Sequence, residues 1–274
     1  MNNMTLTDHL FEQFSDLVYR ECGINLHSGK KSLLQARLNK RLQATGIKNY
    51  DTYYDFLISK EDPREIVSFL DCISTNLTYF FREQQHFDFF NKILSDLIPA
   101  GSRHQDKRIR IWSAGCSTGE EPYSIAMCIA SHISDVNSCD LKILATDIST
   151  RVLAVAKQGI YGDDKLRSLN NHLINKYFKK VNGTSGKYEV NPLLKKIITF
   201  SRLNLKEQYP FKGPFDIVFC RNVMIYFDKQ TQEQLVNRIA SYLAPGGYLF
   251  VGHSESLMGL NHELSYVKPA VYRK

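Results

Sequence analysis

Long apolar runs are missing from this 274-residue sequence, and none is long enough to cross a lipid bilayer. Residues 1–16 are polar and acidic, without the apolar stretch of a signal peptide. None of the six cysteines forms a Cys-x-x-Cys pair or has a nearby histidine at the spacing of metal ligands. We therefore expect no membrane insertion, a cytoplasmic location, reduced cysteines and no metal site.

An excess of negative charge is also lacking, since the formal net charge is +7. A basic surface attracts nucleic acid, anionic membranes or acidic proteins, and charge alone does not choose among them. Low-complexity tracts and internal repeats are absent. With 43% hydrophobic and 23% charged residues, the composition is that of a globular chain with one large domain or two smaller ones.

The N-terminal third has the apolar spacing of helices and no strand pattern. We expect residues 1–95 to form a small basic helical domain and residues 96–107 to form a linker. One helix is predicted over residues 32–45, ending at Gly46. Its apolar stripe comprises Leu33, Leu34, Leu38 and Leu42, and its basic side comprises Lys30, Lys31, Arg37, Lys40 and Arg41.

From residue 108 onward, short apolar strands alternate with helices, which predicts a parallel sheet covered by helices on both faces. An inserted antiparallel β-subdomain is expected at about 177–198, where short apolar runs flank glycines. The predicted fold class is therefore α/β: a Rossmann-like domain over residues 108–274, preceded by the all-α domain. The expected strands are 109–112, 141–145, 197–200, 215–220, 248–251 and 266–272, and the expected helices are 122–132, 150–158 and 229–243.

A glycine-containing turn follows the first expected strand. It does not match the dinucleotide fingerprint, because Ser117 stands two positions after Gly115, and it lacks the lysine of a P-loop. Glu120 and Glu121 would repel a pyrophosphate and suit a cationic ligand such as S-adenosylmethionine, which carries an ammonium and a sulfonium. An ordinary strand–turn–helix with solvated glutamates fits this turn equally well.

Asp147 ends the second expected strand, where a carboxylate can accept hydrogen bonds from ribose hydroxyls. The alternative is a helix N-cap, a role that Ser149 could also fill. Residues 215–227 and 74–83 bring further polar groups toward the sheet edge, with loop-backbone bonding or helix capping as their alternatives. The candidates in these two segments are Arg221, Asn222, Tyr226, Thr78 and Arg82.

Taken together, these segments closely resemble the CheR family of chemoreceptor glutamate methyltransferases. The resemblance covers nearly the whole chain and includes the strings STGEEPYS, TDIS, FCRNVMIYF and GHSES. It implies transfer of the methyl group of S-adenosylmethionine to glutamate side chains of chemotaxis receptors, giving methyl esters and S-adenosylhomocysteine. The implied acceptors lie on cytoplasmic helices of the receptors.

The resemblance also implies residue roles and partners. Arg82 and Tyr226 are expected nearest the reacting methyl group, and the basic helix over residues 32–45 is expected to contact the receptor. Some relatives dock a receptor C-terminal tethering peptide on the β-subdomain. We expect a monomer that binds no nucleic acid. The implied cofactor-binding residues are Asn76, Thr78, Arg82, Glu121, Asp147, Asn204, Leu205, Arg221 and Asn222.

Two other functions are compatible with parts of the sequence. An S-adenosylmethionine-dependent RNA methyltransferase would use the basic domain on phosphates, although this domain has no recognisable RNA-binding motif. A receptor adaptor that only senses the cofactor would need no catalytic residues. His253 is expected to be packed or hydrogen-bonded rather than to act as a general base, because a substrate glutamate is already ionised at neutral pH.

Overall fold

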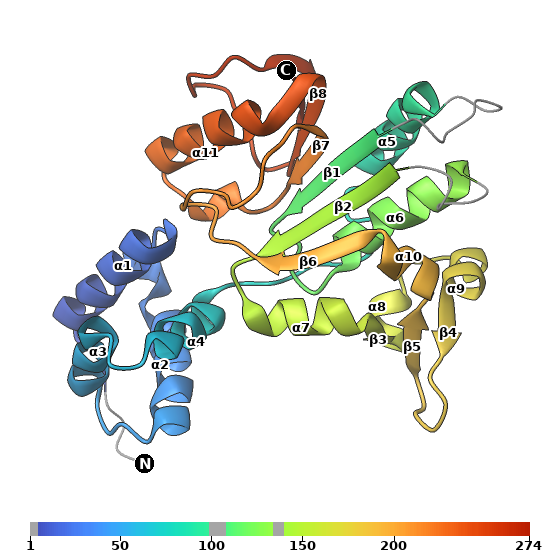
Figure 1. Cartoon of the computed structure of the whole chain (residues 1–274). Coiled ribbons are helices and arrows are strands. Elements are labelled where there is room, and N and C mark those ends of the chain that lie inside the picture. The colour runs from blue at the N-terminus through green and yellow to red at the C-terminus, as the bar shows by residue number, and fades with distance from the viewer. Residues whose placement is uncertain (1–4, 99–107, 134–139) are drawn as a thin grey trace.

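The computed structural model describes residues 5–98, 108–133 and 140–274. Most of the expected linker, together with Cys139, lies outside the described residues. Figure 1 shows a helical domain at the N-terminus beside a larger α/β domain. Within the described part of the chain, no helix combines the length and the apolar character that crossing a membrane requires.

Four α-helices of the N-terminal region pack around one hydrophobic core, which contains Phe14, Tyr53 and Phe69. Their ends follow local sequence signals: Thr7 accepts a hydrogen bond from a backbone N–H at the first helix, and Gly46 ends the second in a left-handed conformation. The elements are α1 (Asp8–Cys22), η1 (Ser28–Lys30), α2 (Lys31–Thr45), α3 (Tyr50–Ser59) and α4 (Pro63–Ile73).

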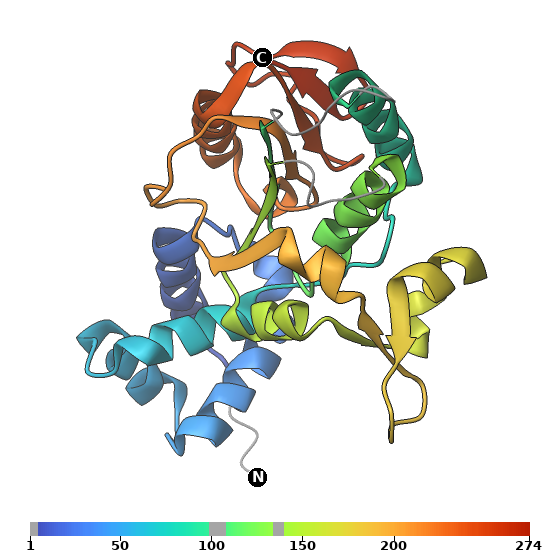
Figure 2. The ribbon, with the colours of Figure 1, turned by 45° about the vertical axis from the view of Figure 1, so that its right-hand side comes forward.

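The next helix, α5 (Gln84–Leu97), belongs to the other domain. Its buried side chains, among them Phe87 and Phe90, join the hydrophobic core of the α/β domain, and the ring of Phe90 lies 5.4 Å from that of Phe219. In Figures 1 and 2, α5 lies on the same side of the sheet as α6 (Glu120–His132). The boundary between the two cores therefore lies near residue 75, about twenty residues before the expected boundary. The apolar period of α5 predicts a helix but does not show which of the two cores its apolar face packs against.

The large sheet has seven strands in the order β6-β2-β1-β7-β8-β10-β9. The first five are parallel, and β10 pairs antiparallel with both neighbours. The expected strand over residues 266–272 is thus a hairpin of two strands. The bounds are β1 (Arg108–Ala114), β2 (Asp140–Asp147), β6 (Ile198–Arg202), β7 (Phe215–Cys220), β8 (Leu243–Val251), β9 (Ser265–Lys268) and β10 (Val271–Arg273).

Alternate residues of the central strands enter two different cores. Ile111 and Phe219 face the core that contains α5 and α6, whereas Trp112 and Val218 face the core under α11 (Lys229–Tyr242). Helices therefore cover both faces of the sheet, as the alternation predicts. Helix α7 (Thr150–Gln158) follows β2 with the bounds expected from the sequence.

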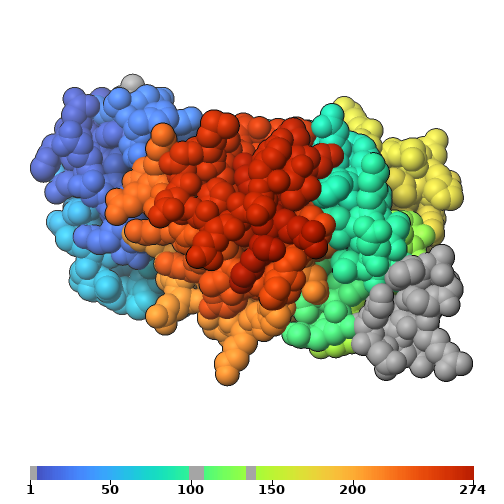
Figure 3. Space-filling model, turned by 90° about the horizontal axis from the view of Figure 1, so that it is seen from above, coloured from blue at the N-terminus to red at the C-terminus, as the bar shows by residue number. Residues whose placement is uncertain are grey.

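The inserted sheet is antiparallel, in the order β3-β5-β4. The expected segment 177–198 includes two of its strands and misses β3, which follows α7 directly. In Figure 3 this subdomain lies at the opposite end of the molecule from the helical domain. The remaining elements are β3 (Ile160–Gly162), α8 (Asp163–Leu166), α9 (Asn171–Tyr177), β4 (Phe178–Lys180), β5 (Lys187–Val190), α10 (Pro192–Lys196) and η3 (Met224–Tyr226).

Candidate active site

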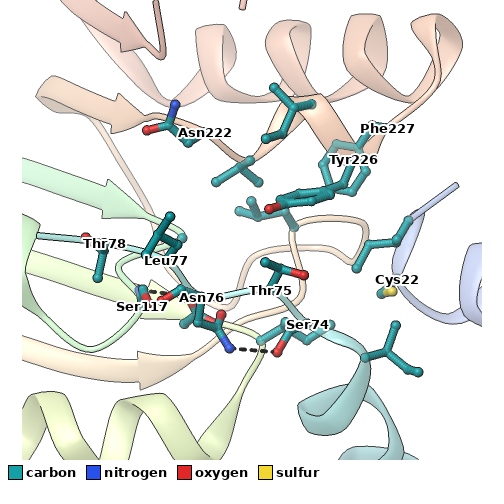
Figure 4. A pocket seen from close by; sticks show the side chains of 18 of the residues that line it. Cys22, Ser74, Thr75, Asn76, Leu77, Thr78, Ser117, Asn222, Tyr226 and Phe227 are labelled. Atoms are coloured by element: carbon teal, nitrogen blue, oxygen red, sulfur yellow. Dashed lines mark hydrogen bonds between the residues drawn. The ribbon is translucent and has the colours of Figure 1, made fainter. Parts of the chain in front are cut away.

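A cavity of about 530 Å³ lies between the helical domain and the carboxyl ends of the central strands. This volume is in the usual range for small-molecule sites, and the position is where doubly wound folds bind ligands. Figure 4 shows several of the side chains that line it. Every residue expected to bind the cofactor or to approach the methyl group is on its wall: Asn76, Thr78, Arg82, Glu121, Asp147, Asn204, Leu205, Arg221, Asn222 and Tyr226.

The turn after β1 requires a glycine at position 115 for two reasons. Its φ is +83°, which disfavours any residue with a Cβ, and a Cβ there would lie 2.4 Å from Val223 Cγ2. The Gly115 N–H donates to the carbonyl of Thr146 at 2.8 Å, which holds the turn against β2. Gly115 thus brings bare backbone to the cavity wall.

Asp147 ends β2 with both carboxylate oxygens held by backbone. Oδ2 accepts from the N–H of Ser117 at 2.8 Å, and Oδ1 accepts from the N–H of Ser149 at 3.0 Å. Burial raises the pKa of Asp147, and these two hydrogen bonds oppose the rise. Ser149 itself caps α7, so Asp147 is not the N-cap. Each oxygen keeps a lone pair for a ribose hydroxyl.

Arg221 is the centre of a buried ionic network beside the cavity. Its Nη1 donates to Glu121 Oε2 and its Nη2 to Glu83 Oε2, each at 3.0 Å, and Nη2 also bonds the Arg82 carbonyl. Ser113 Oγ donates to the other oxygen of Glu121 at 2.7 Å. Burial raises the pKa of Glu121, against the attraction of Arg221. The Nη groups of Arg221 therefore orient protein carboxylates, a role that the expectation of direct cofactor contact did not include.

The two adjacent glutamates of the turn point to different places. Only Glu121 lines the cavity. Glu120 is fully buried, with Oε1 2.9 Å from Lys165 Nζ and Oε2 accepting from Thr118 Oγ1 at 2.6 Å. The idea that both face a cationic ligand is wrong, because neighbouring residues of a helix lie about 100° apart around its axis.

The loop of residues 76–82 forms part of the cavity wall. Asn76 contributes its carbonyl to Ser117 Oγ at 3.0 Å. Arg82 folds back on the loop, where Nη1 donates to the Leu77 carbonyl at 2.9 Å and the guanidinium lies 5.9 Å from the Tyr79 ring centre. Arg82 is thus held in the cavity wall, and its guanidinium has further N–H groups that can donate to a ligand.

Asn222 lines the cavity at the end of β7 and is held in place by Glu255. Asn222 has a φ of +59°, and its N–H donates to Glu255 Oε2 at 2.7 Å. Its Nδ2 donates to Glu83 Oε1 at 3.3 Å. Burial raises the pKa of Glu255, and its backbone hydrogen bonds oppose the rise. Neither Glu83 nor Glu255 is among the residues expected from the sequence, although Glu83 ends the segment 74–83 and Glu255 lies in the string GHSES.

The helical domain closes the other side of the cavity. The Tyr226 carbonyl accepts from the N–H of Asn25 at 2.8 Å, and Asn204 Nδ2 donates to the Glu21 carbonyl at 2.7 Å. The Tyr226 ring extends into the cavity near Thr75 (Figure 4). No local sequence pattern predicts this wall, because it depends on the packing of one domain against the other.

Part of the basic side of α2 is used inside the protein. Arg41 binds Glu65 through two hydrogen bonds of 2.9 and 2.6 Å, and Arg37 binds the Ile73 carbonyl and Thr75 Oγ1. Leu33 of the expected apolar stripe is 40% exposed. Lys40 is exposed and remains available for a partner. Arg37 and Arg41 are thus both bound within the protein, and receptor contact by this helix stays a prediction.

Glu83, His86 and His253 place potential metal-ligand atoms within 4.8 Å of one another. Burial and the positive charge of Arg221 lower the pKa of His86 to about 3. The same positive charge would disfavour a bound cation at this cluster. His253 is not among the residues that line the cavity.

A Rossmann-like sheet with a carboxylate after its second strand, and a cavity at the carboxyl ends of its strands, defines the class of α/β proteins that bind a nucleoside. Residues 76–272 match the family model "CheR methyltransferase, SAM binding domain", and residues 9–74 match "CheR methyltransferase, all-alpha domain". The chain belongs to the CheR methyltransferase family. The resemblance and the fold class inferred from the sequence are thereby confirmed.

Curated relatives cover almost the whole chain. It is 44% identical to the chemotaxis protein methyltransferase of Borreliella burgdorferi over 275 residues, which span 99% of this chain and 96% of that protein. It is 38% identical to the enzymes of the same name from Escherichia coli and Salmonella typhimurium over 271 residues each. These span 98% of this chain and 92% and 91% of those proteins.

Proposed function

We propose that the protein transfers the methyl group of S-adenosylmethionine to glutamate side chains of chemotaxis receptors and so forms methyl esters. The observation that carries the proposal is the cavity that gathers Arg82 and Tyr226 with the expected cofactor-binding residues. The names of the relatives, all chemotaxis protein methyltransferases, support the same substrate.

The polar groups that line the cavity fit this cofactor. Asp147 has lone pairs for ribose hydroxyls, and Gly115 offers backbone without a side chain. Glu121 adds a carboxylate to the wall, which suits a ligand that carries positive charge. S-adenosylmethionine supplies a methyl group bound to a sulfonium sulfur.

The reaction needs no general base. A glutamate side chain has an ordinary pKa of about 4.3, so its carboxylate is already a nucleophile at neutral pH. The transfer forms an oxygen–carbon bond, breaks the carbon–sulfur bond, and leaves the electron pair on sulfur with no proton released. The protein must align the groups and exclude water. Arg82 holds the carboxylate by a forked hydrogen bond, and Tyr226 donates a second bond.

The helical domain and the small sheet are candidates for receptor contact. Lys40 on α2 presents an exposed positive charge, which suits an acidic helical surface. Strands β3 and β4 are the edges of the small sheet, and an edge strand can add a peptide strand. A receptor C-terminal tether at this sheet, a monomeric state and a cytoplasmic location stay predictions.

The proposal is tested with radiolabelled S-adenosylmethionine and membranes that contain chemotaxis receptors. Label should enter the receptors and be released by alkali, because a carboxyl ester is base-labile. Alkali-stable label would contradict ester formation. Transfer to RNA with a steep salt dependence would favour an RNA methyltransferase. Cofactor binding by calorimetry without any transfer would favour a non-catalytic adaptor.

A further inference from the structure

We propose that Lys165 is a positioning residue for methyl transfer, which acts by fixing the loop of residues 76–82 through the carbonyl oxygen of Thr78. Lys165 lies on α8, within the region that carries the small sheet, and outside every motif that the sequence analysis selected. The inference rests on the proposed function, because it assigns a role in that reaction.

The ammonium group of Lys165 joins two parts of the site. Nζ donates to the Thr78 carbonyl at 3.2 Å and lies 2.9 Å from Glu120 Oε1. The Glu120 side chain is fully buried, whereas that of Lys165 is 35% exposed. An ammonium has three donors, so one group can bond the Thr78 carbonyl and form an ion pair with Glu120. A hydrogen bond from a charged donor is also stronger than one between neutral groups. Lys165 therefore ties the loop to the first turn of α6.

The bond from Lys165 holds the Thr78 carbonyl, and the neighbouring Leu77 carbonyl is the one that orients Arg82. The Leu77 carbonyl accepts from Arg82 Nη1 at 2.9 Å, and the Thr78 carbonyl accepts from Lys165. The N–H of Phe81 donates to Ser124 Oγ at 3.0 Å. A shift of the Thr78 peptide would therefore move the carbonyl to which the Arg82 guanidinium is bound.

Aromatic packing from the small sheet supports the same loop. The ring of Phe80 is fully buried, 5.1 Å from that of Tyr161 on β3 and 5.4 Å from that of Phe178 on β4. The Tyr161 hydroxyl donates to the Thr118 carbonyl at 2.7 Å. The loop thus packs on the small sheet, and Lys165 adds a polar bond that holds the Thr78 peptide.

A purely structural role is the alternative, in which Lys165 only neutralises the buried Glu120. Two variants separate the roles. Lys165→Met removes both interactions and leaves a buried carboxylate without its cation, which costs stability. The double variant Lys165→Met with Glu120→Gln removes that charge and keeps a group that can bond Thr118, but it cannot restore the bond to Thr78.

The test measures kcat and KM for a receptor fragment carrying the acceptor glutamates, the Kd of S-adenosylmethionine, and urea unfolding. We expect the double variant to recover most of the stability lost in Lys165→Met. Its kcat should stay lower than that of the unmodified protein by about tenfold or more, with a smaller change in Kd, because misplaced reacting groups slow transfer. Lys92→Met, at an exposed lysine of α5, should change kcat by less than about twofold.

A double variant with unchanged kcat would overturn the proposal, as would a variant in which only the Kd of the cofactor changes. If the unmodified protein transfers no methyl group to the receptor fragment, the proposed function fails instead, so the two failures are distinguishable.

Discussion

Arg221 Nη1 donates to Glu121 Oε2 at 3.0 Å in a place where the guanidinium side chain is 1% exposed and the carboxylate side chain 13% exposed. The same guanidinium binds Glu83 at 3.0 Å, so one buried cation serves two carboxylates. A buried charge is stable only while its partners remain, and this network therefore links the cavity wall to the stability of the domain.

Replacing Arg221 should destabilise the protein. Arg221→Met leaves Glu121 and Glu83 buried without their cation, and we expect the free energy of unfolding to fall by about 3–5 kcal/mol. Urea unfolding followed by circular dichroism measures it. Arg20→Met is the control, because the Arg20 side chain is 65% exposed and should cost less than about 0.5 kcal/mol. Equal costs for the two variants would argue against a buried network.

The stability should depend on pH through His86. Its pKa is lowered to about 3 by burial and by Arg221, whereas an unfolded histidine has a pKa of about 6.5. Between these values the unfolded state binds a proton that the folded state does not, so stability falls as the pH falls below 6.5.

His86→Phe should remove this dependence. Between pH 7 and pH 5, we expect the unmodified protein to lose about 2 kcal/mol more than the variant. Unfolding free energies at the two pH values provide the comparison. His172→Phe, at an exposed position, should follow the unmodified protein. Parallel pH curves for the His86 variant and the unmodified protein would contradict the assignment.

Gly115 should be required for cofactor binding. Gly115→Ala places a methyl group 2.4 Å from Val223 Cγ2 at a φ of +83°, which shifts the turn on the cavity wall. We expect the Kd of S-adenosylmethionine to rise by about tenfold or more, measured by calorimetry. Gly183→Ala is the matched control, since Gly183 has a φ of +77° with no atom within 4 Å of the added Cβ. Similar losses of affinity in both variants would mean that backbone strain, not the cavity, is responsible.

Arg82 should matter for the acceptor more than for the fold. Arg82→Lys keeps the charge but loses the planar fork that binds a carboxylate. We expect kcat/KM for the receptor to fall by about a hundredfold, with little change in unfolding free energy. Arg167→Lys, at an exposed site, is the control. Full methylation by the Arg82 variant would exclude Arg82 from the reaction.

Lys40, rather than Arg37 or Arg41, should report receptor contact by α2. Lys40→Glu reverses an exposed charge, so KM for the receptor should rise several-fold at low salt and less at high salt. Lys92→Glu makes the same change on α5 and should have little effect. Reversing Arg41 instead would break its bonds to Glu65 and confuse binding with folding. A KM unaffected by Lys40→Glu would place the receptor elsewhere.

Local signals in the sequence were sufficient for several elements. The period of α7 and its cap at Ser149 predict the helix as observed, because capping and apolar spacing act within one turn. The apolar run over residues 266–272 predicts one strand where the structure has the hairpin of β9 and β10, because such a run does not show where the chain reverses. Strand β3 has three residues and too little pattern to be recognised.

The sequence by itself determined the α/β class and the family, and through the family resemblance it predicted a group of residues that line the cavity. Those at the ends of parallel strands must meet at one edge of the sheet. Only the tertiary structure decided how those side chains are used. The pairing of Arg221 with Glu121, the diversion of Glu120 to Lys165, and the wall formed by the helical domain all join residues far apart in the chain. Such contacts depend on how the elements pack against one another, and no local pattern records them.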